Sequence, residues 1–193
     1  MNVCVYGASS SRIEPEYFSE AERLGRLLAE NGFGLVFGGG REGLMGAVSR
    51  GAFSKGGRII GIAPRFFDEP GILCENCSEL IFTETMNERK ALMAQYSDAF
   101  IALPGGIGTF EELFETLTLK QLGRTDKAIV LLNTLDYYAP IQSLLFKTAE
   151  SGFMSSGCLE LYYLASTPED AIEYIKSYSP QTGSIKRLSD YGK

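Results

Sequence analysis

Histidine is absent from all 193 residues of the sequence. Its absence excludes Ser-His-Asp triads, histidine-based acid and base catalysis, and histidine-rich metal sites. A proton transferred in a catalytic site of this protein would have to move through other groups, such as a carboxylic acid or water.

Positive charge is also scarce, because 18 lysine and arginine residues face 24 aspartate and glutamate residues, which gives a net charge of -6. Binding to duplex nucleic acid needs a concentrated basic face, and none is present, so we expect no nucleic-acid partner. A few local cations suffice for a small anionic ligand, which stays possible.

Long hydrophobic runs are missing as well. The apolar stretch 1–7 is too short for a signal peptide, and no run approaches the ~18 apolar residues of a membrane span. We therefore expect no membrane partner and a cytoplasmic location.

Cysteine occurs only four times, and only Cys74-Glu75-Asn76-Cys77 has a suggestive spacing. A zinc site would need a second such pair, and redox pairs of this kind usually open a helix soon after the first strands. We expect no metal and favour plain reduced thiols, with a functional pair as the alternative.

Short apolar runs alternate with amphipathic stretches from one end of the chain to the other. The expected strands are 3–6, 34–37, 59–63, 80–83, 99–103, 128–132 and 161–165, and the expected helices are 16–31, 43–55, 86–96, 109–122, 137–151 and 168–177. Because parallel strands need helical crossovers, the pattern predicts an α/β, Rossmann-like fold, with a mostly parallel sheet of about seven strands and helices on both faces.

The length and the hydrophobic content of 45% fit one domain, which we place at 1–180, followed by a polar tail at 181–193. Residues 64–78 contain Pro, Gly, Asp and Glu without periodicity, which predicts a long surface loop. Long loops in such folds often cover the site.

Ligands of an open parallel sheet collect at the carboxyl ends of the strands, so the loops 37–43, 84–90 and 104–112 are the candidates. The first contains Gly38-x-Gly40-x-x-Gly43, which matches a dinucleotide fingerprint. It does not follow the first strand, however, and no acidic residue ends the next one. A tight turn that allows close helix packing is favoured, and NAD(P) binding is the weaker alternative.

The third loop is rich in glycine, with Gly105, Gly106 and Gly108 before Thr109. Such a backbone can turn its N–H groups toward an anion, and the threonine adds a hydroxyl group at the expected helix start. It is not a Walker A loop, because Gly-Lys-Ser/Thr is missing. Residues 109–112 also match a capping box, so phosphate binding and helix capping are equal alternatives.

The helix that follows has an apolar stripe of four residues, Phe110, Leu113, Phe114 and Leu117. Its spacing leaves Glu111, Glu112, Glu115 and Thr118 off the stripe, where the carboxylates are available for chemistry. A helix dipole also favours acids in the first turns, and Glu115 is the one that we expect to be simply solvated.

Arg89 lies on the apolar stripe of the helix 86–96, because Leu92, Met93 and Tyr96 follow it at i+3, i+4 and i+7. An inward guanidinium must meet a carboxylate or a phosphate, and a structural salt bridge is one possibility. The strands 80–83 and 99–103 are consecutive, and we expect them to be neighbours, which would bring Arg89 to the loop 104–112. An arginine, a carboxylate and a phosphate site would then share one crevice.

These motifs together resemble the LONELY GUY family, the cytokinin riboside 5'-monophosphate phosphoribohydrolases, which are often mislabelled lysine decarboxylases. The resemblance runs through nearly the whole chain, and the pairing of its third and fourth motifs is highly specific. The motifs are Gly38-Gly39-Gly40 with Gly43-Leu44-Met45-Gly46, Gly61-Ile62-Ala63-Pro64, Met86-x-x-Arg89-Lys90, Pro104-Gly105-Gly106-x-Gly108-Thr109-x-Glu111-Glu112 and Gln121-Leu122-Gly123.

The resemblance implies hydrolysis of the N-glycosidic bond of a purine riboside 5'-monophosphate, a cytokinin nucleotide or AMP, to the free base and ribose 5-phosphate. It implies no metal or organic cofactor. Arg89 and Glu112 match the catalytic pair of the family. The positions that match its substrate contacts are Lys90, Gly105, Gly106, Ile107, Gly108, Thr109, Glu111 and Thr118. Family members are typically dimers or larger, with partner residues that complete the pocket, so a homodimer is expected.

Two departures from the family pattern concern the choice of base. Asn87 replaces the histidine that is common there, and Leu119-Lys120 stands where many members have Trp-Ala. Selection between AMP and N6-prenylated nucleotides is therefore open. The alternative function is a non-catalytic nucleotide-binding or sensing module of the same superfamily, against which the retention of Arg89 and Glu112 counts. An NAD-dependent oxidoreductase is the weakest hypothesis.

Overall fold

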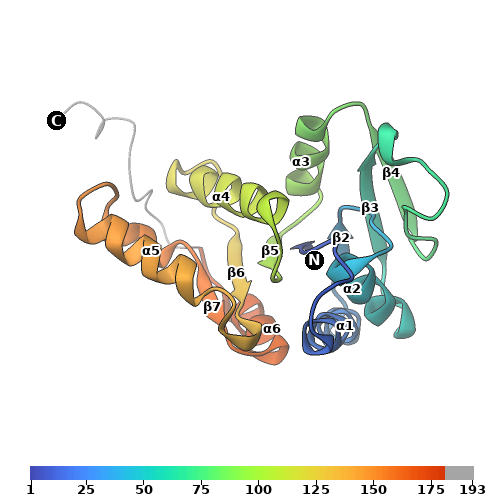
Figure 1. Cartoon of the computed structure of the whole chain (residues 1–193), viewed down its shortest axis with the longest axis horizontal. Helices are drawn as coiled ribbons and strands as arrows, with labels where there is room; N and C mark the ends of the chain where they lie inside the picture. The colour runs from blue at the N-terminus through green and yellow to red at the C-terminus, as the bar shows by residue number, and fades with distance from the viewer. Residues whose placement is uncertain (181–193) are drawn as a thin grey trace.

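A computed structural model of the protein describes residues 1–180. The seven strands of this part of the chain form one sheet, in the order β4-β3-β2-β1-β5-β6-β7, and all neighbours are parallel (Figure 1). The expected α/β, Rossmann-like class is confirmed.

Every strand and helix expected from the sequence is present, with ends that shift by a residue or two. The strands are β1 (Asn2–Tyr6), β2 (Gly34–Phe37), β3 (Ile59–Pro64), β4 (Glu79–Thr83), β5 (Ala99–Ala102), β6 (Ala128–Leu132) and β7 (Tyr163–Ala165). The α-helices are α1 (Pro15–Glu30), α2 (Gly43–Ser54), α3 (Met86–Gln95), α4 (Ile107–Gln121), α5 (Ala139–Glu150) and α6 (Pro168–Ser177). Short 3-10 helices occupy Arg65–Phe67, Thr134–Asp136 and Ser156–Glu160. After the last of them, β7 begins two residues later than expected.

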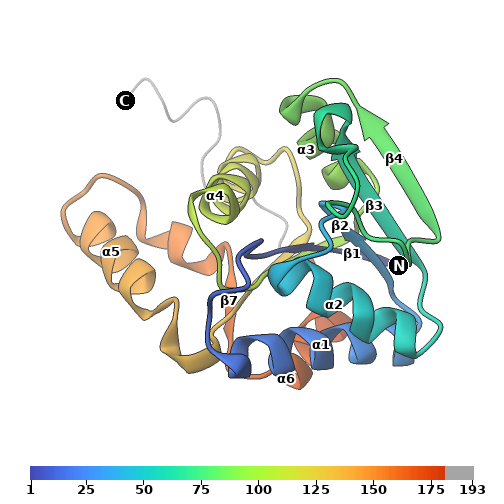
Figure 2. The ribbon, with the colours of Figure 1, turned by 45° about the vertical axis from the view of Figure 1, so that its right-hand side comes forward.

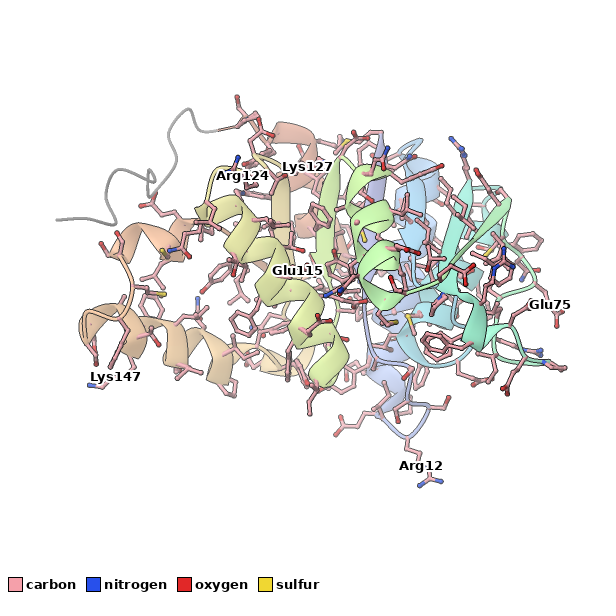
Figure 3. The ribbon with its side chains drawn as sticks, turned by 90° about the horizontal axis from the view of Figure 1, so that it is seen from above. Arg12, Glu75, Glu115, Arg124, Lys127 and Lys147 are labelled. Carbon is pink, nitrogen blue, oxygen red and sulfur yellow. The ribbon has the colours of Figure 1, made fainter. Side chains whose placement is uncertain are left out.

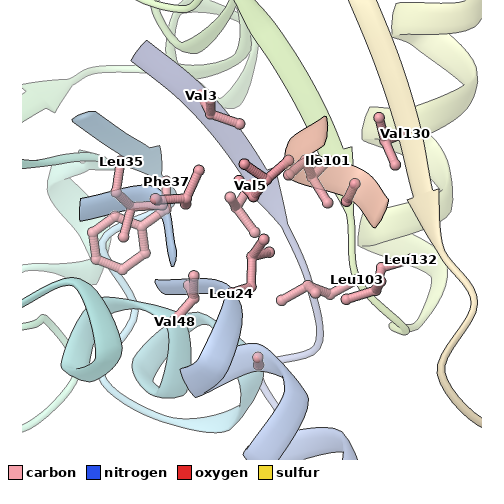
Figure 4. Close-up of a cluster of buried hydrophobic side chains, with 14 of the residues drawn as sticks. Val3, Val5, Leu24, Leu35, Phe37, Val48, Ile101, Leu103, Val130 and Leu132 are labelled. Atoms are coloured by element: carbon pink, nitrogen blue, oxygen red, sulfur yellow. The ribbon is translucent and has the colours of Figure 1, made fainter. Parts of the chain in front are cut away.

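The core has two layers, one on each face of the sheet, because successive side chains of a strand point to opposite faces. Val3 and Val5 of β1 belong to the layer that α1, α2 and α6 cover (Figure 4). Cys4 and Tyr6 belong to the other layer, which contains Met93 of α3 and further residues of α4. Figures 1 and 2 show the same division of the helices. Burial on both faces explains why these strands are almost continuously apolar in the sequence.

Helix α3 begins where its sequence provides a capping box. The backbone N–H of Glu88 donates to the Thr85 hydroxyl at 3.1 Å, and the Glu88 carboxylate accepts from the Thr85 N–H at 3.4 Å. Both ends of this reciprocal cap satisfy N–H groups that the first turn leaves without partners. The cap fixes the first turn of α3, and with it the direction in which Arg89 points.

The expectation that β4 and β5 are neighbours is wrong. The strands β3, β2 and β1 lie between them, because the chain builds the sheet from the centre to the β4 edge and then returns to the centre through α3. Helix α3 packs on β3 and β4 during this return. The order of the strands in the sequence does not show whether the strand after β4 is added beside β4 or on the far side of β1.

The polar tail expected at 181–193 lies outside the described residues. Within residues 1–180, the helices are all too short or too polar to cross a membrane.

Candidate functional site

The candidate site lies where the direction of the sheet order reverses, between β1 and β5. Strand β1 is followed by α1 on one face of the sheet, and β5 is followed by α4 on the other face. The two connections therefore diverge, and a crevice at the carboxyl ends of such strands is the usual ligand site of an open α/β sheet. The N–H of Ala8 donates to the carbonyl oxygen of Pro104 at 3.1 Å, which joins the two loops at this point.

The start of α4 is open and has no side-chain cap. The N-cap residue is Gly106, and no side chain bonds to the N–H groups of the first turn. A Cβ atom added to Gly106 or Gly108 would meet no other atom within 4 Å, and Ile107 between them is 86% exposed. Free N–H groups at the positive end of a helix favour a bound anion. The start of α4 is therefore left open, as the phosphate-binding alternative requires.

The capping-box alternative for residues 109–112 is wrong. Helix α4 starts at Ile107, two residues earlier than expected, so Thr109 already lies in the first turn and is buried. The carboxylate of Glu112 binds Arg89 and not the backbone of a cap residue. Residues 109–112 therefore do not form a capping box.

The loop before α4 is held by two consecutive tyrosines. The hydroxyl of Tyr138 donates to the carbonyl oxygen of Leu103 at 2.7 Å, and that of Tyr137 donates to the carbonyl oxygen of Gly105. A side chain at Gly105 has no room, because its Cβ would lie 2.1 Å from the Thr109 hydroxyl. These contacts fix the loop that leads into α4.

Arg89 reaches the site from α3 and is bound on several sides. Its Nη1 atom donates to the Glu112 carboxylate at 2.8 Å, and its Nε atom donates to the carbonyl oxygen of Ile62 at 3.1 Å. The side chains of Arg89 and Glu112 are only 7% and 10% exposed. The sequence predicted that this guanidinium points inward and meets a carboxylate or a phosphate, and the structure shows it bound to a carboxylate.

Gly38 explains why Arg89 can occupy this position. A Cβ atom at residue 38 would lie 2.0 Å from the Nη2 atom of Arg89, so only glycine leaves room for the guanidinium. Gly43 has a φ of 62° and would place a Cβ atom 2.3 Å from the carbonyl oxygen of Ala8. The two outer glycines of the apparent dinucleotide fingerprint are thus explained by contacts within the protein.

Glu112 is a buried carboxylate whose pKa is raised. Burial raises the pKa above its ordinary value, and the charge and hydrogen bond of Arg89 oppose this rise only in part. A raised pKa lets a carboxyl group exchange protons nearer neutral pH, as acid and base catalysts do.

The buried face of α4 is rotated relative to the apolar stripe that the sequence predicted, although Leu113 and Leu117 belong to both. Glu112 and Thr116 are buried, whereas Phe114 is 37% exposed. Polar contacts account for this rotation, since Thr116 lies 3.2 Å from the Tyr6 hydroxyl and Glu112 binds Arg89. The expectation that Glu112 lies off the buried face is therefore wrong.

Lys90 links α3 to α4 beside the buried pair. Its ammonium group binds the carboxylates of Glu111 and Glu115, the latter at 2.9 Å, and its side chain is 13% exposed. Hydrogen bonds to both glutamates raise the pKa of Lys90, so it stays charged. Glu115 points into the region between the two helices in Figure 3. It is ion-paired, and the expectation of a simply solvated Glu115 is wrong.

Thr118 is not part of the cluster around the start of α4. It is exposed, and its hydroxyl donates to the carbonyl oxygen of Phe114 at 2.7 Å. Nine residues of helix separate it from Thr109, a distance of about 13 Å at ~1.5 Å per residue. Within one chain, the structure brings together all the expected site residues except Thr118.

Several residues of the site escaped the sequence analysis. Gly38 and Tyr137 were not assigned to it, and neither was the loop after β1, residues 7–11, whose Ala8 binds the end of β5. The position of that loop after the first strand was the available signal. In the part of the chain that the structure describes, no group of three or more His, Cys, Asp or Glu side chains is placed to hold a metal ion.

Comparisons with known proteins agree with this architecture. A family model described as "Possible lysine decarboxylase" matches residues 45–175. The probable cytokinin riboside 5'-monophosphate phosphoribohydrolase LOGL2 of Oryza sativa subsp. japonica is 42% identical over 179 residues, which cover 93% of this chain and 73% of that protein. The cytokinin riboside 5'-monophosphate phosphoribohydrolase LOG4 of Arabidopsis thaliana is 39% identical over 183 residues, which cover 95% of this chain and 85% of that protein.

A solved structure shows the same fold in a protein with a different name. The molybdenum cofactor binding protein of the phototrophic bacterium Rippkaea orientalis superposes with a TM-score of 0.71 at 27% identity, covering 91% of this chain and 95% of that chain. The curated relatives are more similar to this chain in sequence than this solved structure is. The extent of these matches means that the chain belongs to the LONELY GUY family of phosphoribohydrolases, within the broader family described as possible lysine decarboxylases.

Proposed function

We propose that the protein hydrolyses the N-glycosidic bond of a purine riboside 5'-monophosphate and releases the free base and ribose 5-phosphate. The substrate class comprises cytokinin riboside 5'-monophosphates and AMP. The observation that supports this proposal most strongly is the buried pair of Arg89 and Glu112 beside the uncapped start of α4. The curated relatives are named for the same reaction on cytokinin nucleotides.

The uncapped start of α4 is suited to the 5'-phosphate. The N–H groups of residues 107–109 and the hydroxyl of Thr109 would bind its oxygens, and no side chain at Gly106 or Gly108 obstructs it. Lys90 would add a positive charge near this end of the substrate. Binding of the phosphate would fix the ribose relative to the catalytic pair, which lowers the entropic part of the barrier.

Glu112 would act at the anomeric carbon. As the bond from C1' to the base nitrogen breaks, its electron pair leaves with the base and positive charge develops on the ribose. The carboxylate stabilises this charge and accepts a proton from the water molecule whose oxygen bonds to C1'. Arg89 would keep the carboxylate in place and help to orient the nucleotide. The leaving nitrogen takes its proton from solvent water, Glu112 returns the proton it accepted to solvent, and no metal or organic cofactor is needed.

The proposal is tested by incubating the protein with AMP and, separately, with isopentenyladenosine monophosphate, and by measuring free base by chromatography. We expect base from at least one of them. Glu112→Gln keeps the shape of the side chain and should reduce base release at least ~100-fold, the usual range for a lost general base. Circular dichroism verifies that this variant is folded.

Two results would contradict the proposal. Nucleotide binding without base release from either substrate would favour the alternative, a non-catalytic binding or sensing module. Near-normal turnover by Glu112→Gln would remove the glutamate from the reaction. Comparing the two substrates also tests whether the departures at Asn87 and Leu119, both exposed, affect the choice of base.

We further propose that the protein is a homodimer. Helix α5, at the β7 end of the sheet, buries no residue, and Leu144 and Phe146 on it are 61% and 48% exposed (Figure 2). Phe153, just after this helix, is 86% exposed. Large apolar side chains exposed on one element suit contact with another protein chain. A second copy of the chain is the occupant that family resemblance supports, and Thr118 on the exposed face of α4 would then be available to the partner.

Light scattering at several protein concentrations tests this assembly. Phe146→Glu should halve the measured mass, whereas Phe53→Glu should not, although Phe53 on α2 is similarly exposed at 56%. A monomeric wild-type protein, or equal effects of the two variants, would refute this interface. We also propose a single domain over 1–180, which the single sheet supports, and a cytoplasmic location, which fits four cysteines that form no disulfide with one another within residues 1–180.

A further inference from the structure

The loop between β3 and β4 brings two cysteines together, away from the Arg89 and Glu112 pair. Glu75 and Asn76 form the turn between Cys74 and Cys77. The ends of a four-residue turn lie within about 7 Å of each other, measured between Cα atoms. Disulfides span Cα separations of ~4.4 to ~6.8 Å. The two thiols can therefore be joined without moving the strands on either side.

Backbone contacts hold this loop against the segment that follows β2. The N–H of Cys74 donates to the carbonyl oxygen of Gly39 at 2.8 Å, and the N–H of Arg41 donates to that of Ile72 at 2.9 Å. Glu75 of the loop lies at the outer edge of the molecule in Figure 3, far from Glu115. The cysteine pair thus occupies a fixed position on the surface.

Hydrogen-bond donors surround the sulfur of Cys74. The hydroxyl of Ser49 on α2 lies 3.0 Å from Sγ, and the thiol of Cys77 and the N–H of Asn76 also bond to it. The positive charge of Arg50 lies nearby. Led by the hydrogen bond from Cys77, these groups lower the pKa of Cys74 to about 6, while the pKa of Cys77 is raised. The two shifts have opposite directions, so Cys74 is the member of the pair that loses its proton first, the asymmetry typical of reactive cysteine pairs.

A cavity of about 410 Å³ gives access to Cys74. Its lining consists of Arg41, Glu42, Gly46, Arg50, Cys74, Glu75 and Asn76. A water molecule takes up only ~30 Å³, so small oxidants can enter. The acids have partners, because Glu75 binds Arg41 at 3.1 Å and Glu42 accepts from Ser11 at 2.9 Å. By contrast, Cys4 and Cys158 are buried in the core, and burial raises the pKa of Cys4 to about 12.

We propose that Cys74 and Cys77 form a thiol–disulfide site, in which a hydroperoxide that enters the cavity oxidises Cys74 and Cys77 completes the disulfide. The Cys74 thiolate attacks one oxygen of the peroxide, the O–O bond breaks, and hydroxide or alkoxide leaves. The product is a sulfenic acid, in which sulfur has lost two electrons to the peroxide. The sulfur of Cys77 then attacks Sγ of Cys74, the S–O bond breaks, and water leaves with the proton of the Cys77 thiol.

The first test measures how the alkylation rate of each cysteine in the folded, reduced protein depends on pH. Peptide mapping after iodoacetamide treatment gives the four rates. We expect the rate of Cys74 to level off with a midpoint near 6, well below the ~8.5 of an ordinary cysteine. Ser49→Ala should move the midpoint upward. Cys4 and Cys158 should not react while the protein is folded.

The second test treats the reduced protein with an equimolar amount of hydrogen peroxide and follows the products by mass spectrometry. We expect a disulfide between Cys74 and Cys77. In Cys77→Ser, the sulfenic acid should remain on Cys74 and be trapped by dimedone, whereas Cys74→Ser should form neither product. The proposal is overturned if Cys74 titrates like an ordinary cysteine, or if peroxide leaves both thiols reduced or oxidises them without joining them. None of these measurements depends on base release, so they are independent of the proposed hydrolysis.

Discussion

Gly38→Ala tests whether the position of Arg89 depends on the absence of a side chain after β2. The added Cβ atom would lie 2.0 Å from Nη2 and 3.1 Å from Cζ of Arg89. Ordinary contact begins near ~3.5 Å, so the guanidinium must move by about 1.5 Å. Such a movement would weaken or break its bonds to Glu112 and to the carbonyl oxygen of Ile62.

This substitution is expected to reduce both catalysis and the stability of the fold. Misplacement of a catalytic group by about 1 Å can reduce the rate roughly 100-fold, and we expect a loss of that size in kcat/KM for base release. Overpacking typically costs ~1 to ~3 kcal/mol of unfolding free energy. Loss of the whole ion pair would cost more, ~3 to ~5 kcal/mol, because Glu112 would remain buried without a partner.

The matched control is Gly40→Ala in the same loop. Its Cβ atom would come within 2.8 Å of Cε of Met45, the far end of a flexible side chain that can turn aside. Base release and denaturant unfolding are measured for both variants, and Gly40→Ala should stay within a few-fold of the wild-type kcat/KM. Nearly unchanged activity of Gly38→Ala, or an equal loss in both variants, would refute the reasoning.

Two further predictions concern the pKa of Glu112 and the loop before α4. Because burial raises the pKa of Glu112, its basic form is lost at higher pH than in an exposed glutamate. On acidification, kcat/KM should therefore fall at a pH above the ~4.3 of an ordinary glutamate. A fall only at or below that pH would show that the raised pKa does not govern the reaction. Tyr137→Phe removes the hydroxyl that binds the Gly105 carbonyl oxygen and should reduce kcat/KM by roughly 10-fold, as expected for one hydrogen bond worth ~1 kcal/mol or slightly more. The control is Tyr178→Phe, which removes a hydroxyl bound to the backbone of Asp126. Equal kcat/KM for the wild type and the two variants would show that Tyr137 does not position the loop.

The sequence predicted the elements of the fold well because their cause is local. Strands buried on both faces must be apolar throughout, as Ala128–Leu132 shows, and amphipathic helices repeat their buried residues with the helical period. The pairing of strands is not local. The return of the chain through α3 separates β4 from β5, although they follow each other in sequence.

One contact of the candidate site was predictable from the sequence, because a buried arginine has few possible partners. An arginine on an apolar stripe needs a carboxylate or phosphate, and Arg89 indeed binds Glu112. The inward face of α4 was not predictable from hydrophobicity, because Tyr6 and Arg89, distant in sequence, draw Thr116 and Glu112 inward and leave Phe114 outside. The role of Gly38 was not predicted for a related reason. The lack of a side chain at residue 38 matters only because Arg89 fills the space, and Arg89 is distant in sequence.

The two tyrosines before α5 have a consequence for the electrostatics of recognition. Their phenolic hydroxyls donate to the carbonyl oxygens of Leu103 and Gly105, so the O–H dipoles partly offset the negative ends of these two peptide dipoles. The proposed phosphate site would then be formed mainly by the positive end of α4, because the charge of Lys90 is shared with Glu111 and Glu115. A protein with a net charge of -6 can in this way attract a phosphate over a short range while its overall field repels one.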